Sequence, residues 1–260
     1  SFHKIILVIY LIISLMYSQN YLMSKNIKIA VGLIYILCLS LILYGFFIFI
    51  DVTRLNDYIY IRDKTQFLIE IRDQNLFLFT TLFFVFSIIW ILLLGFATPI
   101  ALIAGFLFGK IYGTLISVFG FTLGCTLLYI FANQYFKSLI LKKLSQRISK
   151  FKDIFNKNEF LYFMIFRFAG GGGTPFAIQN LLPVIFNMKV KNYFFSTLIG
   201  LFPMVFILCA IGSGIEKIIE NNIDPSFLIM IQNKEILFPI LGFFIILIFS
   251  FLLRKIYFKK

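Results

Sequence analysis

Long apolar segments constrain the fold of this chain more than any other feature of its sequence. They occupy residues 29–50, 76–109, 113–136, 160–186, 193–211 and 236–253. A helix of about 20 apolar residues crosses the hydrocarbon core of a bilayer, and several of these segments reach that length. Because 61% of the residues are apolar and only 13% are charged, too few polar side chains remain to cover a water-facing surface. The sequence predicts an all-α polytopic membrane protein.

The placement of charge orients these segments. A net charge of +13 would suggest nucleic-acid binding in a soluble protein, but in a membrane protein Lys and Arg gather in cytoplasmic loops. An AT-rich genome would also produce many lysines, so we use the positions of the charges and expect no nucleic-acid partner. Residues 137–157 hold seven basic residues and one acidic residue. Residues 51–74 hold four basic and five acidic residues, and residues 212–235 hold two basic and four acidic residues. The positive-inside rule places the first stretch in the cytoplasm and the other two outside.

Two of the apolar segments are broken and predict re-entrant hairpins. Residues 76–109 break at 95–99, and the second limb, about 11 residues or roughly 16 Å of helix, is too short for a ~30 Å core. Residues 160–186 break at 170–175 and have basic residues on both sides. We expect the first hairpin to enter from outside and the second from the cytoplasm, each followed by a transmembrane helix. Two inverted units of this kind are common in transporters.

The expected organisation then covers the whole chain. Residues 1–28 are an N-terminal extension or an extra helix, 29–50 and 236–253 are flanking transmembrane helices, 51–75 and 215–235 are extracytoplasmic loops, 76–214 are the core, and 254–260 are a basic cytoplasmic tail. Within the core, residues 137–157 have the pattern of a basic amphipathic helix that lies on the inner leaflet. The alternative is a solvated linker helix packed on its neighbours.

The second hairpin carries the residues expected to bind a ligand. Arg167 lies among apolar residues, where a charge costs at least ~2.5–3.5 kcal/mol on insertion scales, so something must offset that cost. A glycine run can present bare backbone N–H groups to an anion, and Thr174 and Pro175 suit the cap and first turn of a helix whose N-terminus points at the same anion. The expected anion-binding or lipid-binding residues are Arg167, Gly170, Gly171, Gly172, Gly173, Thr174, Pro175, Gln179 and Asn180.

A plainer interpretation of the same hairpin stays open. Arg167 pairs with local carbonyl groups, or its side chain reaches the cytoplasmic face, and the glycines only make the turn.

The sequence favours no other chemistry. His3 is the only histidine, and Cys38, Cys125 and Cys209 lie in three separate apolar segments. A histidine-based triad or a metal cluster is therefore not expected, and we expect no cofactor and no enzymatic activity.

Small residues mark expected packing positions in the first half of the core. Gly105, Gly109 and Gly113 follow one another at four-residue spacing, as do Gly120 and Gly124. This spacing lets helix backbones approach closely. We expect Pro99, Gly200 and Pro203 to contribute to the packing of the hairpins and helices as well.

Two motifs in this region form a recognisable pair. The first runs from Pro99 through Ala104-Gly105-Phe106-Leu107-Phe108-Gly109 to Gly113, and the second joins Phe166-Arg167, Pro175-Phe176, Asn180 and Pro183 to Thr197, Gly200 and Pro203. Together, over roughly residues 76–214, they resemble the VTT-domain, DedA-like membrane proteins, also called SNARE-associated Golgi proteins. Asn187 and Asn133 depart from the family pattern, which often has a glycine and an arginine there, and no acidic residue lies near Pro99.

The resemblance implies lipid handling. Members of the family are associated with phospholipid scrambling, with flipping of polyprenyl-phosphate carriers and with membrane homeostasis. We therefore expect a protein of the cell (inner) membrane that translocates a phosphate-bearing lipid, with membrane lipids as its partners. The alternative is a non-transporting membrane organiser that binds partners or lipid through residues 137–157.

Overall fold

The computed structural model of the chain describes residues 51–54, 58–93, 95–135 and 158–220, together with single residues or short pieces between 33 and 45, at 137 and 155, and between 233 and 248. The expected segments at 1–28, 29–50, 137–157 and 254–260 lie wholly or largely outside the described residues, and the expected segment at 236–253 is described in part.

Helices and their connections make up the described part of the chain, which confirms the predicted all-α class. In chain order they are η1 (Val52–Arg54), α3 (Tyr58–Gln74), α4 (Leu76–Leu92), α5 (Ala97–Tyr135), α7 (Glu159–Phe168), η2 (Gly170–Gly173), α8 (Phe176–Phe186) and α9 (Val190–Glu220). By length and apolar composition α5 and α9 can each cross a bilayer, and the bent pair α3–α4 counts as a third span if its two parts are taken together. The protein is an all-α membrane protein.

The tip of the first hairpin lies where the sequence breaks at residues 95–99. Helix α4 ends at Leu92, and α5 begins at Ala97. Between them the indole N–H of Trp90 donates a hydrogen bond to the Phe96 carbonyl oxygen at 2.9 Å, and the Gly95 N–H donates to the Trp90 carbonyl oxygen at 2.9 Å. Any side chain at Gly95 would collide with the Trp90 ring, so glycine is required at this turn.

The first limb of α5 returns alongside α4. The ring of Phe108, near the end of that limb, lies 5.9 Å from the Phe79 ring and 5.2 Å from the Phe83 ring. Gly109 then takes a φ of 74°, which interrupts the helix and separates this limb from the long second limb. Glycine adopts this backbone conformation without the steric cost that other residues incur.

The second hairpin consists of α7, the glycine turn η2 and α8. Its two ends meet at Glu159, whose carboxylate accepts hydrogen bonds from the Lys189 N–H at 3.2 Å and from the Asn192 side-chain amide at 2.6 Å. Helix α8 ends at Asn187 in the left-handed conformation, with φ 54° and ψ 42°. Asparagine tolerates this conformation better than most residues, so the chain can turn here although Asn187 stands where the family pattern often has a glycine.

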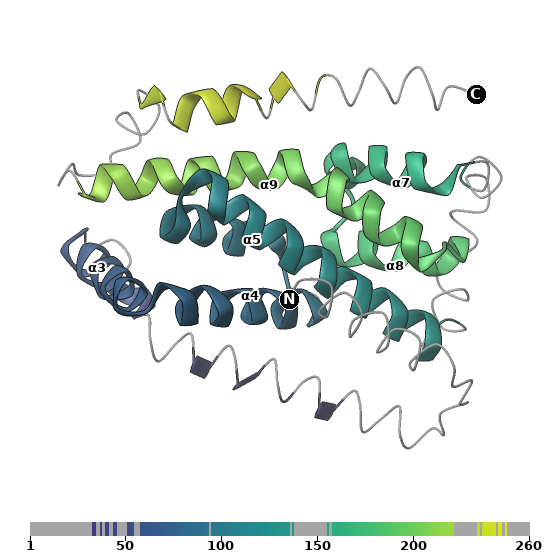
Figure 1. Cartoon of the computed structure of the whole chain (residues 1–260), viewed down its shortest axis with the longest axis horizontal. Helices are drawn as coiled ribbons and strands as arrows, with labels where there is room; N and C mark the ends of the chain where they lie inside the picture. The colour runs from purple at the N-terminus through teal and green to yellow at the C-terminus, as the bar shows by residue number, and fades with distance from the viewer. Residues whose placement is uncertain are drawn as a thin grey trace.

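The two hairpins open toward opposite ends of the molecule. Figure 1 shows α3, the base of α4 and the C-terminal end of α9 at one end, and the open end of the α7–α8 hairpin at the other. The long helices α5 and α9 pack against each other between them. This opposed arrangement agrees with the predicted pair of inverted units, and the bilayer side from which each hairpin enters stays a prediction.

Close backbone approaches hold the helices together. Gly105 of α5 lies directly against the Cys209 backbone of α9, with no room for a side chain, and Gly212 lies in the same way against the Leu102 carbonyl group. Contacts between apolar chains and lipid are as favourable as contacts between helices, so packing of small residues is a main source of helix association in membranes.

Two segments that were expected to be loops contain helix. The segment expected as an extracytoplasmic loop at 51–75 forms α3, which meets α4 at a bend of 115°. The apolar residues Ile59, Phe67 and Ile71, spaced by eight and four residues, were the missed signal. Helix α9 continues through Glu220, beyond the expected start of a loop at residue 215. With 31 residues, α9 is about 46 Å long and exceeds a ~30 Å core. Its end can therefore extend outside the bilayer, and the extracytoplasmic position of both segments stays a prediction.

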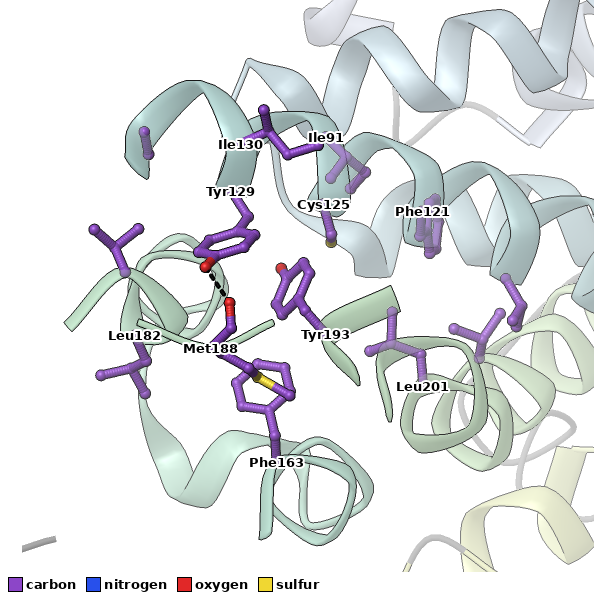
Figure 2. Packing of buried hydrophobic residues seen from close by; sticks show 14 of the residues in the cluster. Ile91, Phe121, Cys125, Tyr129, Ile130, Phe163, Leu182, Met188, Tyr193 and Leu201 are labelled. Atoms are coloured by element: carbon purple, nitrogen blue, oxygen red, sulfur yellow. Dashed lines mark hydrogen bonds between the residues drawn. The ribbon is translucent and has the colours of Figure 1, made fainter. Parts of the chain in front are cut away.

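A buried cluster joins α5 to the second hairpin and the start of α9. Figure 2 shows Tyr129 of α5 above Met188, with the Tyr129 hydroxyl donating to the Met188 carbonyl oxygen. Tyr193 lies between Cys125 and Phe163 in the same view. The ring of Tyr193 lies 4.9 Å from that of Tyr129 and 5.2 Å from that of Phe163. This aromatic cluster borders the polar site described below.

Candidate functional site

Arg167, near the end of α7, is the largest fully buried side chain among the described residues, with 1% of its surface exposed. Its guanidinium group is bound by neutral polar groups. Nη1 donates to Gln179 Oε1 at 3.3 Å, and Nη2 donates to Asn180 Oδ1 and to the Tyr193 hydroxyl oxygen at 3.0 Å. Three acceptors from α8 and α9 therefore replace part of the hydration shell that the cation would have in water.

Aromatic rings enclose the same cation. The guanidinium carbon lies 5.1 Å from the Phe163 ring centre, 5.3 Å from the Phe176 ring centre and 5.9 Å from the Tyr193 ring centre. The negative ring faces attract a cation within about 6 Å. Neither these rings nor the polar acceptors carry a formal negative charge, and in the described part of the chain no acidic side chain forms an ion pair with Arg167.

The glycine turn packs on Gln179. Gly170 and Gly171 take φ values of 64° and 73°, and any side chain at Gly171 would collide with the Gln179 carboxamide. Gln179 Nε2 donates to the Thr174 carbonyl oxygen at 2.8 Å and to the Gly170 carbonyl oxygen at 3.3 Å. Toward the site, the turn therefore offers carbonyl oxygens to a side-chain donor, where the sequence had suggested bare N–H groups for an anion.

The expected cap of α8 is wrong. The Thr174 hydroxyl donates to the Gly171 carbonyl oxygen at 2.7 Å and does not cap α8, because the carbonyl group of the tight turn lies within its reach. Pro175 takes the N-cap position, one residue before the expected first turn, and makes no side-chain capping bond there.

Two donors at the centre of the site have no acceptor in the described structure. They are Arg167 Nε and Asn180 Nδ2, and both side chains are almost fully buried. A buried donor without a partner costs roughly 1–3 kcal/mol. The site therefore has spare hydrogen-bond donors beside an unneutralised cation, which is the chemistry that an oxyanion satisfies.

The structure brings Arg167, Gln179 and Asn180 together and places the other expected residues around them. Gly170, Gly171, Gly172, Gly173 and Thr174 form the adjoining turn, and Pro175 is exposed at its end. Gly200 packs against Arg167 from α9, and Pro203 lies one turn further along the same helix.

The remaining expected packing residues lie in α5. Gly113 meets the Ala104 carbonyl group of the preceding limb, whereas Gly120 and Gly124 meet α4. Pro99 is exposed in the first turn of α5.

Sequence reasoning missed the aromatic part of the site. Phe163 lies four residues before Arg167 on the same helix, a spacing that places two side chains on one face and could have indicated the contact. Tyr193 lies 26 residues from Arg167 in the sequence. No local pattern indicates that pairing.

A second polar cluster lies at the other end of the molecule, between α3, α5 and α9. Arg72 of α3 donates through Nη1 to the Leu107 carbonyl oxygen at 2.6 Å and lies 3.7 Å from the Glu216 carboxylate. Its Nε donates to Asp73 at 2.7 Å. This cluster fastens the base of the first hairpin to the end of α9. Among the described residues no group of His, Cys, Asp or Glu could hold a metal ion.

In the described part of the chain, two opposed broken hairpins, two long apolar helices and one buried cation at a hairpin tip define a polytopic α-helical membrane protein built from hairpin-and-helix units. Residues 95–214 match the family model of the VTT domain. This part of the chain is a VTT domain, as the resemblance of its motifs predicted.

Two relatives illustrate how distant the similarity is. The chain is 22% identical over 161 residues to a Transmembrane protein 41 homolog of Caenorhabditis elegans, a match that covers 58% of this chain and 64% of the relative. It is 27% identical over 141 residues to the uncharacterized protein YqeD of Bacillus subtilis, covering 52% of this chain and 67% of the relative. The chain thus spans less than two thirds of the length of the worm protein. No solved structure matches significantly.

Proposed function

We propose that this protein translocates a phosphate-bearing lipid across the bilayer, by flipping or scrambling, and that Arg167 is the residue that contacts the phosphate group. The observation that carries the proposal is the burial of the Arg167 guanidinium without an ionic partner in the described residues. A lone buried cation in a low-dielectric interior is costly, and a bound anion repays that cost.

The donors around Arg167 support a ligand with several oxygen atoms. Arg167 Nε and Asn180 Nδ2 are unpartnered, and an arginine fork matches the geometry of phosphate oxygens. A headgroup phosphate would supply the negative charge and accept from both donors. The lipid tails would stay in the apolar surroundings of the hairpins.

The proposed setting follows from family membership and from the charge distribution. We place the protein in the cell (inner) membrane as a multi-pass protein with its C-terminus in the cytoplasm, and we propose lipids as its partners. Transport is the activity proposed, with no covalent chemistry. The alternative organiser function depends on residues 137–157, and those described, Lys137 and Phe155, contact the second hairpin: Phe155 stacks on Phe186 at 4.2 Å.

The experiment reconstitutes the full chain into phosphatidylcholine vesicles that contain a trace of NBD-labelled phosphatidylglycerol. Dithionite reduces the label in the outer leaflet only, so continued loss of fluorescence measures lipid movement. Arg167→Gln should slow this movement by at least about tenfold, because hydrogen bonds from a charged donor are worth ~1.5–3 kcal/mol.

Arg54→Gln is the matched control, because Arg54 is exposed and lies outside both hairpins, with its guanidinium carbon 4.8 Å from the centre of the Tyr60 ring. Its rate should equal that of the wild type. Wild-type protein that moves no labelled lipid, or an Arg167→Gln variant that moves it at the wild-type rate, would refute the proposal.

A further inference from the structure

The Gln179 carboxamide occupies the space between Arg167 and the glycine turn. Its oxygen accepts from Arg167 Nη1 at 3.3 Å, and its nitrogen donates to the carbonyl oxygens of Gly170 and Thr174. The side chain is 94% buried, since only 6% of its surface is exposed. A single neutral group therefore accepts a hydrogen bond from the Arg167 guanidinium and donates hydrogen bonds to the carbonyl groups of the turn.

The contact with Arg167 is longer than the shorter of the two contacts with the turn. At 3.3 Å it lies beyond the usual N–H···O range, as does the 3.3 Å contact with the Gly170 carbonyl oxygen, whereas the bond to the Thr174 carbonyl oxygen is 2.8 Å long. A phosphate oxygen carries negative charge and is a stronger acceptor for a guanidinium than an amide oxygen. An anion that reached Arg167 would therefore displace the Gln179 oxygen from Nη1.

Displacement of Gln179 has a consequence for the turn. The Gln179 carboxamide fills the space beside Gly171, where an added side chain would collide with it. If that carboxamide moves, the Gly170 and Thr174 carbonyl groups lose their donor. Buried carbonyl groups without a donor are costly, so the turn opens toward water or lipid headgroups.

We propose that Gln179 is a latch: its carboxamide holds the place of an anion oxygen on Arg167 while it keeps the Gly170–Gly173 turn closed, and a phosphate group releases both contacts at once. The inference rests on the proposed function for the identity of the displacing anion. The closed state of the turn does not depend on that function and can be measured without any ligand.

The ligand-free test uses hydrogen exchange of the full chain in dodecyl maltoside, read by mass spectrometry over residues 170–174. The Thr174 N–H donates to the Gly171 carbonyl oxygen at 3.1 Å in the closed turn. Gln179→Leu keeps a similar volume but cannot bridge, and exchange over these residues should rise by at least about tenfold because two hydrogen bonds are lost. Gln74→Leu, an exposed glutamine in α3, is the matched control and should leave the turn unchanged.

The ligand test titrates each protein with dihexanoyl phosphatidic acid and, in a separate arm, with sodium phosphate. In Gln179→Leu the affinity should rise by roughly threefold to tenfold, because the anion no longer has to displace the long hydrogen bond from the Arg167 guanidinium to the Gln179 oxygen. In Gln179→Glu the new carboxylate pairs with Arg167 and should lower the affinity by at least about tenfold. Binding of phosphatidic acid alone would show that the acyl chains are needed, whereas binding of both probes would show that the phosphate group suffices. Either result supports the latch if Gln179→Leu binds more tightly than the wild type and Gln179→Glu binds more weakly.

The two tests separate two kinds of failure. If no probe binds any of the proteins but Gln179→Leu still opens the turn, the proposed phosphate ligand is wrong and the closing contact stands. If exchange over residues 170–174 is the same in Gln179→Leu and in the wild type, the latch is wrong. Equal phosphate affinity in Gln179→Leu and Gln179→Glu would also overturn it.

Discussion

Gly200 of α9 lies against Arg167 of α7 so closely that no side chain fits between the two helices. A methyl group on Gly200 would lie 2.6 Å from the Arg167 Cβ and 2.8 Å from the Met164 carbonyl oxygen. The first unit contains a matching pair, because Gly120 of α5 lies against Ser87 of α4 in the same way. The two units thus contain the same kind of close glycine contact, and only in the second unit is the contacted residue charged.

Gly200→Ala should push α7 away from α9 and destabilise the protein by about 1–3 kcal/mol, the usual cost of overpacking a buried contact. The unfolding midpoint in detergent, followed by the monodisperse fraction after heating, measures the effect. Gly242→Ala is the matched control because nothing lies within 4 Å of the added methyl group. Equal midpoints for the two variants would contradict the close packing of α7 on α9.

Asn180→Asp replaces a neutral acceptor of Arg167 by a carboxylate of almost the same shape. The resulting internal ion pair should neutralise the cation and abolish transport of NBD-labelled phosphatidylglycerol while the fold is kept. Lipid movement in vesicles and the unfolding midpoint are measured on the same preparation. Asn75→Asp serves as the control, since Asn75 caps α4 at the surface and aspartate caps helices equally well. Wild-type transport by Asn180→Asp would exclude Arg167 as the phosphate contact.

Substitutions at Asn187 test the left-handed backbone conformation that follows α8. Asn187→Ala should cost about 1 kcal/mol because a Cβ disfavours positive φ when no side-chain amide compensates, whereas Asn187→Gly should stay within a few tenths of a kcal/mol of the wild type. Asn187→Gly also removes the 2.8 Å contact from Lys137 Nζ to the Asn187 side chain, which is exposed and therefore weak. The unfolding midpoints of the two variants decide the point, and a more stable alanine variant would contradict the assigned geometry.

The ion pair of Asp73 with Arg72 should make the stability of the protein depend on pH. The hydrogen bond with the Arg72 guanidinium holds the pKa of the Asp73 carboxyl below its ordinary value. A lowered pKa in the folded state means that the pair adds stability above pH about 4, the pKa range of a free aspartate, and loses it as the pH falls further. The difference in unfolding midpoint between wild type and Asp73→Asn should therefore be positive at pH 7 and become smaller as the pH falls below about 4. A difference that grows on acidification would reverse the sign argued here.

The sequence predicted much of this architecture because the breaks in apolar segments are local signals. Gly95 and the glycine run at 170–173 marked both hairpin tips, and Arg167, Gln179 and Asn180 were grouped because they share one hairpin. Tyr193 was missed because it reaches Arg167 from another helix. The Thr174 cap was wrong because the hydroxyl found a nearer acceptor in the Gly171 carbonyl group.

Helix α3 was missed for a different reason. Charged residues are interspersed among its apolar residues, and the exposed apolar positions Ile59, Phe67 and Ile71 do not form a continuous run. The mixed composition therefore suggested a loop, whereas the spacing of these side chains by eight and four residues favours a helix.

The acceptors of Arg167 also bear on how the protein is made. Gln179, Asn180 and Tyr193 all follow Arg167 in the chain, so the arginine leaves the ribosome before any of the groups that bind it. A bare arginine in a helix centre opposes membrane insertion by ~2.5–3.5 kcal/mol. We therefore expect the insertion machinery to hold α7 at the membrane surface or within its own channel until the start of α9 has emerged, and to release the second hairpin and α9 into the lipid as one unit.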